Sequence, residues 1–170
     1  LETVLDEYVK VPLNIADYRT EQTGITAANL KNGVSFDQAR TQVAKMIKGK
    51  ILIGHGLETD LSALGLSHPV SDVRDTATYS PLKESKKDAS VEGTLMPKEL
   101  NVLAKEHLKR NVGSPTEEAA VCMDLYKQAR KDWESNLMQL VHKKEKQQHE
   151  VGMRSGGVSV PLSAIREGEI

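Results

Sequence analysis

The sequence predicts one α/β domain, because segments with a strand pattern alternate with segments that have a helical pattern. Residues 3–11 alternate apolar and polar side chains, and residues 50–56 form a short apolar run that ends in glycine, so both are expected to be strands. Residues 35–49 and the much longer stretch 114–150 repeat apolar side chains at helical spacing, so both are expected to be helices.

The other segments predict shorter elements within a single domain of residues 1–150. In the helix at 35–49, Ser35 is expected to cap the start and Gly49 the end. Its apolar face should consist of Phe36, Ala39, Val43, Met46 and Ile47. We further expect a loop at 12–26, a helix at 57–66, a strand and turn at 73–82, a polar loop at 83–94, a helix at 96–109 with Pro97 in its first turn, and an extended tail at 151–170.

The bulk composition is that of an ordinary globular domain. Of the 170 residues, 38% are hydrophobic and 28% charged, and the formal net charge is -1, so any nucleic-acid site must be local. The single cysteine excludes a disulfide framework and favours a reducing compartment. No apolar run approaches the roughly 20 residues of a membrane helix, and we expect no membrane partner. Because the chain begins at Leu1 within an apolar run, we expect an upstream segment in the parent protein.

The segment KILIGHGLETDLSALGLSHP carries the strongest chemical signal. The strand at 50–56 delivers Gly54, His55 and Gly56, and Asp60 follows in the first turn of a helix. An acid at this edge of a sheet is well placed to hold a metal ion, although a first-turn acid often only complements the helix dipole. Spacing alone leaves both interpretations open.

The chain resembles the DEDDh 3'-5' exonuclease superfamily, and within it the RNA exonuclease 4 family. The segments DEYVKVPLNIADYRTEQTGIT, VRDTATYSPLK, LNVLAKEHL and EEAAVCMDLYKQARKDWE stand in family order around the segment above, over about residues 4–135. The resemblance implies an RNase H-like mixed sheet flanked by helices, with N-terminal strands missing from this chain. It also implies action on RNA, with pre-rRNA and pre-ribosomal particle proteins as partners, in the nucleus or nucleolus.

The same resemblance implies two ions, Mg²⁺ or Mn²⁺, held by four acids, with a histidine as general base. Asp60 matches the second motif. The first motif, an Asp-x-Glu pair, is expected upstream of Leu1. The third motif aligns with GSPTEEA, where Gly113 takes the place of the histidine and Glu118 that of an aspartate. Asp60 and Glu118 are therefore the candidate catalytic and metal-binding residues, and we expect catalysis to be weak or absent.

As local chemistry, GSPTEEA predicts only a helix start. Ser114 is a good N-cap, Pro115 occupies the first helical position, and Glu117 has the spacing of a capping box. Both interpretations of the segment stay open at this stage: a relic of a metal site, or an ordinary capped turn.

Candidate RNA contacts follow from the resemblance and from local charge. They are His55, Gly56, Lys127, Arg130 and Lys131. Each also has a plainer interpretation, since His55 suits a packed loop and a basic cluster is usually a solvated helix face.

Several other residues invite a functional role but favour a structural one. We expect Asp75 to organise a turn, and Cys122 and Trp133 to pack in the core.

Three functions remain open from the sequence. The first is an RNA-binding, RNA exonuclease 4-like domain in rRNA processing with weak or no hydrolysis. The second is an active metal-dependent 3'-5' RNA exonuclease whose missing motif lies outside the chain. The third is a non-catalytic scaffold that docks on a protein partner through its long helix and tail. The sequence does not set the oligomeric state.

Overall fold

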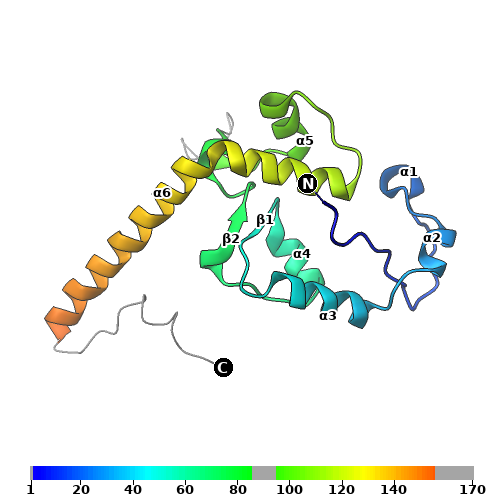
Figure 1. The fold of residues 1–170 in the computed structure, drawn as a ribbon, viewed down its shortest axis with the longest axis horizontal. Coiled ribbons are helices and arrows are strands. Elements are labelled where there is room, and N and C mark those ends of the chain that lie inside the picture. Colours follow the sequence, from blue (N-terminus) through cyan, green and yellow to red (C-terminus); the bar gives the residue numbers. More distant parts are fainter. Residues whose placement is uncertain (1, 86–94, 156–170) are drawn as a thin grey trace. The chain divides into compact units, whose positions relative to one another are not determined.

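The computed structural model describes residues 2–85 and 95–155 of the chain. The chain divides into two compact units, Leu1–Lys127 and a second unit that begins at Gln128. The first unit mixes helices with two small sheets, and the described part of the second is helical (Figure 1). The predicted α/β class is confirmed.

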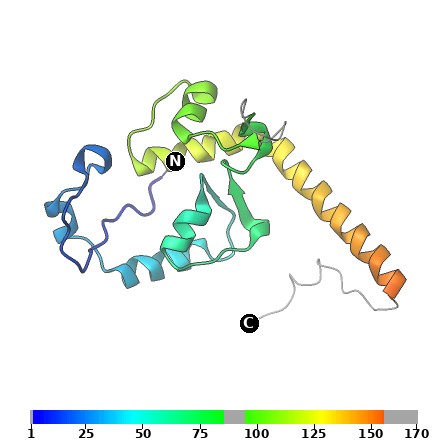
Figure 2. The ribbon, with the colours of Figure 1, turned by 180° about the vertical axis from the view of Figure 1, so that it is seen from behind.

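The central feature of the first unit is a parallel pair of strands. Strands β1 (Leu52–Gly54) and β2 (Val73–Asp75) pair in register, with Leu52 opposite Val73 and Gly54 opposite Asp75. Helix α4 (Leu57–Ala63) begins directly after β1, and the turn η1 (Val70–Asp72) leads into β2 (Figure 2). The predicted strands at 50–56 and 73–82 and the helix at 57–66 are thus present, each shorter than its sequence pattern.

The strand predicted at residues 3–11 is wrong. Only an isolated parallel bridge joins Val9 to Val34, with Val34 N–H donating to Tyr8 O and Lys10 N–H donating to Val34 O, both at 2.8 Å. The bridge requires glycine at position 33, because a Cβ there would lie 2.9 Å from the Tyr8 carbonyl carbon. Residues 3–11 alternate in polarity, but among the described residues no neighbouring strand extends the pairing into a ladder.

The loop predicted at 12–26 is wrong in part, because it contains a short helix. Helix α1 (Thr20–Thr23) ends at Gly24, which adopts a left-handed φ of 69°. Helix α2 (Ala27–Lys31) follows, and Thr26 caps it in a capping box with Asn29. Short polar sequences such as TEQT carry no apolar periodicity, so the pattern could not reveal them.

Helix α3 (Phe36–Ile47) confirms the helix predicted at residues 35–49, with its caps. Ser35 accepts a hydrogen bond from Gln38 N–H and the Gln38 side chain accepts one from Ser35 N–H, which closes a capping box. Gly49 follows the helix with a left-handed φ of 66°. Of the expected apolar face, Ala39 is buried, whereas Phe36 is 43% exposed.

The rest of the first unit packs around the start of the long helix. Turn η2 (Ser80–Leu82) precedes an antiparallel pair, β3 (Glu84–Ser85) and β4 (Leu95–Met96); most of the predicted polar loop lies outside the described residues. The helix predicted at 96–109 starts only at Leu100, after the extended Glu99, so the prediction that Pro97 lies in its first turn is wrong. It consists of α5 (Leu100–Leu103) and a π-helical turn, η3 (Ala104–Leu108). The core cluster comprises Leu82, Leu103, Ala104, Val121 and Leu125.

Helix α6 (Pro115–Ser155) is the long helix that the sequence predicts. It continues past residue 150, where the tail was expected to begin, and the rest of that tail, 156–170, lies outside the described residues. In the second unit Trp133 is 5% exposed, so its predicted core position is confirmed. No helix in residues 2–85 and 95–155 has the length and apolar character needed to cross a membrane.

Candidate active site at the ends of the parallel strands

The Asp75 carboxylate organises the site. Asp75 ends β2 and is only 7% exposed. Its Oδ1 accepts hydrogen bonds from Gly56 N–H and Ala77 N–H, each at 2.9 Å, and its Oδ2 accepts one from Leu57 N–H at 3.0 Å. Asp75 therefore forms its own turn, as predicted, and also caps α4 from the neighbouring strand, which the sequence could not show. Charge-assisted bonds to backbone N–H groups are among the stronger ones in proteins.

His55 is fixed by Thr76. The buried Thr76 hydroxyl donates to Gly54 O at 3.0 Å, so His55 Nδ1, at 2.9 Å from the same oxygen, is the donor in that contact. The imidazole is thus held in one orientation, which leaves Nε2 for any further partner. The Gly56 N–H is already bonded to Asp75, so it is not available for an RNA contact.

Asp60 lies in the first turn of α4 with its side chain exposed. Within residues 2–85 and 95–155, its carboxylate takes part in no hydrogen bond or ion pair. Since α4 is fixed at its start by Asp75, the backbone that carries Asp60 is rigidly placed while the carboxylate itself stays available.

The GSPTEEA segment forms a capped helix start, as local chemistry predicts. Ser114 Oγ accepts from Glu117 N–H at 3.3 Å, and Glu117 Oε2 accepts from Gly113 N–H at 2.8 Å. The glutamate thus reaches one residue further back than in a standard capping box. Gly113 is exposed, and a Cβ added there would meet only Glu117 Oε2, at an ordinary 3.5 Å. A side chain at position 113 is therefore sterically allowed.

Cys122 connects the start of α6 to the end of β2. It lies one turn after Glu118, is buried, and forms a side-chain hydrogen bond with Thr76. Burial raises the pKa of the Cys122 thiol to about 11, and the nearby charges of Glu118 and Asp75 add to that increase. The charges of Glu118 and of Asp75, which ends β2, therefore both act on the Cys122 thiol. The predicted packing role of Cys122 is confirmed.

The described residues do not by themselves assemble a complete metal site. Asp60 and Glu118 are exposed carboxylates, but no group of three His, Cys, Asp or Glu side chains in residues 2–85 and 95–155 is placed to hold an ion. Two carboxylates fall short of the ligand set that a divalent ion requires, so no chemical step is assigned to a metal here.

The basic residues predicted to contact RNA lie in both units of the chain. Lys127 lies in the first unit, 3.9 Å from Asp124 Oδ1, and its side chain is 57% exposed. Arg130 and Lys131 are exposed in the second unit.

The fold and the motif order are similar to those of RNase H-like exonuclease domains. Residues 2–65 match the Exonuclease family known as RNase_T. In solved structures the fold is similar to Pan2: the Neurospora crassa Pan2 catalytic unit gives a TM-score of 0.60 at 23% identity, over 82% of this chain and 23% of that one. The Saccharomyces cerevisiae Pan2 module in complex with AAGGA RNA gives a TM-score of 0.61 at 24% identity, over 89% of this chain and 25% of that one. These likenesses establish the fold.

Among named proteins, the chain is similar to RNA exonuclease 4. It is 38% identical over 135 residues to the Homo sapiens protein, covering 78% of this chain and 31% of that one. It is 39% identical over 143 residues to the Candida glabrata protein, covering 82% of this chain and 52% of that one. The chain thus spans between about a third and a half of these relatives. The predicted resemblance to the DEDD-type exonucleases and RNA exonuclease 4 is confirmed.

Proposed function

We propose that this chain is an RNA exonuclease 4-like domain that binds RNA during rRNA processing, with weak or no 3'-5' exonuclease activity of its own. The named relatives are RNA exonucleases, which supports RNA as the ligand. The observation that carries the loss of activity is Gly113, which offers a backbone N–H to Glu117 where the family implies a general base.

The expected loss of exonuclease rate follows from the missing general base and the displaced carboxylate. Without a positioned base, the attacking water loses about 100- to 10,000-fold in rate. Replacing aspartate by Glu118 moves the carboxylate by one methylene, and a misplacement of about 1 Å can cost about 100-fold.

The test is turnover of a 5'-labelled single-stranded RNA in Mg²⁺ or Mn²⁺. Wild type should give little or no ladder of shortened products, and Gly113→His with Glu118→Asp should increase the rate. A Cβ added at position 113 makes only an ordinary contact, which favours this variant. Processive trimming by wild type that disappears in Asp60→Ala would overturn the proposal and establish the active-enzyme alternative.

The cellular setting is part of the same proposal. We place the protein in the nucleus or nucleolus, in contact with pre-rRNA and pre-ribosomal particle proteins, and Mg²⁺ or Mn²⁺ as the ion of any residual activity. Crosslinking in cells followed by sequencing of bound RNA should recover pre-rRNA. Recovery of messenger RNA alone would contradict the assignment.

A protein-docking scaffold is the second candidate, and one observation favours it. In the second unit α6 exposes Met138, Leu140 and Val141, at 69%, 55% and 49%. Binding of RNA as a function of salt separates the two candidates, because phosphate contacts impose a steep salt dependence that a protein scaffold would lack.

A further inference from the structure

We propose that the π-helical turn and its flanks form a contact for the phosphate backbone of single-stranded RNA. The basic face consists of Lys98, Lys105, Lys109 and Arg110. This inference rests on the proposed RNA-binding function and names a surface for it.

Charge is concentrated at this segment. Residues 98–110 hold these four cations against two acids, Glu99 and Glu106, which gives a net charge of +2 in a chain whose total is -1. A local basic surface on a near-neutral protein is the electrostatic signature of a backbone contact.

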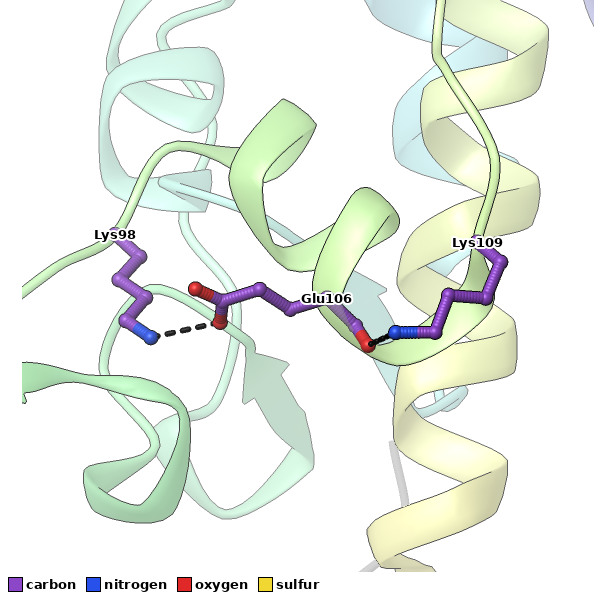
Figure 3. Close-up of polar contacts among 3 residues, drawn as sticks. All are labelled: Lys98, Glu106 and Lys109. Carbon is purple, nitrogen blue, oxygen red and sulfur yellow. Dashed lines mark hydrogen bonds and ion pairs between the residues drawn. The ribbon is translucent and has the colours of Figure 1, made fainter.

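Two acids near this face, Glu106 and Asp124, are paired with its cations. Glu106 Oε2 accepts from Lys98 Nζ at 2.7 Å, while Lys109 Nζ donates to the Glu106 carbonyl oxygen at 2.9 Å, so the two lysines approach the same residue (Figure 3). The bond from Lys98 lowers the pKa of the Glu106 carboxyl, which therefore stays charged. Asp124 is paired with Arg110 at 2.8 Å and with Lys127 at 3.9 Å.

Lys105 and Lys109 are available to bind a phosphate, because neither forms an ion pair with a carboxylate of the described residues. Lys109 bonds a neutral carbonyl, so its charge is not cancelled there, and its backbone is held in a left-handed conformation with a φ of 56°. Lys105, on the π-helical turn, is exposed, and its ammonium group has no hydrogen bond or ion pair with any other described residue. The contacts that fix Lys98 and Arg110 thus hold the segment in place while Lys105 and Lys109 present charge.

The basic face is connected to helix α6. Residue 110 is followed by the short segment that leads into Gly113 and the start of α6, and Arg110 is tied to Asp124 on that helix.

The experiment measures the salt dependence of RNA binding by the full chain. Fluorescence anisotropy of a labelled single-stranded oligouridine is recorded between 50 and 200 mM KCl. Lys105→Gln with Lys109→Gln should reduce the slope of log K against log salt by about 1.4, since each single-strand contact contributes about 0.7. At 0.1 M salt this corresponds to a loss of about 25-fold in affinity.

Two further variants make the outcome decisive. Lys45→Gln with Lys48→Gln removes the same charge from the exposed end of α3 and should leave the slope unchanged. Glu106→Gln removes an acid from the basic face and should strengthen binding, which a misfolded variant would not do. An unchanged slope in the first variant, or an equal loss in the α3 variant, overturns the basic face while RNA binding stands. Absence of RNA binding by wild type overturns both this inference and the proposed function.

Discussion

Asp75 caps the helix that begins at Leu57, across a gap of eighteen residues in the chain: its Oδ2 accepts the Leu57 N–H at 3.0 Å. The same carboxylate accepts two more backbone N–H groups through Oδ1. One buried side chain therefore couples the end of β2 to the start of α4, and so to the position of Asp60.

Replacing Asp75 by alanine should destabilise the fold by about 2–3 kcal/mol, because three backbone N–H groups lose their acceptor. Urea unfolding followed by circular dichroism measures the change. Asp60→Asn is the matched control, since the Asp60 carboxylate has no partner among the described residues, and it should shift the unfolding free energy by less than about 0.5 kcal/mol. Equal losses in the two variants would contradict the capping role.

Gly33→Ala should cost about 1–3 kcal/mol, since the new methyl group would lie 2.9 Å from the Tyr8 carbonyl carbon and force the bridge between Val9 and Val34 apart. Amide hydrogen exchange of Lys10 and Val34 should accelerate in the variant. Gly113→Ala, where the added Cβ has an ordinary contact, should leave the unfolding free energy almost unchanged. If the two alanines behave alike, the close approach at Gly33 is not required.

Cys122 should be unreactive in the folded protein at pH 8, because a thiol with a pKa of about 11 is only about 0.1% thiolate there. A colorimetric thiol reagent should modify it only after denaturation.

The raised pKa of the Cys122 thiol also predicts that the free energy of unfolding depends on pH. The folded pKa lies above the ordinary 9.0, so the contribution of Cys122 is complete below about pH 9 and is lost as pH rises toward 11. The difference in urea midpoint between wild type and Cys122→Ala should change across that window. A constant difference would contradict it.

Replacing Lys98 by methionine should raise the pKa of the Glu106 carboxyl toward its ordinary 4.5, since the hydrogen bond from Lys98 is the main cause of its lowered value. Carbon-detected NMR titration of the Glu106 carboxyl measures it. In wild type the lowered pKa means that this bond stabilises the fold above pH 4.5 and is lost as pH falls through the folded pKa. Lys105→Met should leave the Glu106 titration nearly unchanged, and a similar shift there would show a general charge effect instead of the specific bond.

The sequence by itself determined the elements whose signals are local. Helix α3 begins at a serine and ends before a glycine, α6 begins with Ser114 and Pro115, and each start can be recognised from adjacent residues because caps act over a single turn. The motif order around Asp60 was also enough to predict the exonuclease fold.

Only the tertiary structure decided which residues meet. That Asp75 caps α4, that Thr76 orients His55 and bonds Cys122, and that Arg110 is tied to Asp124 all depend on contacts between segments far apart in the chain. The alternation at residues 3–11 predicted a strand, yet Val9 forms only a bridge with Val34, since a strand needs a partner along its length and side-chain pattern alone does not supply one.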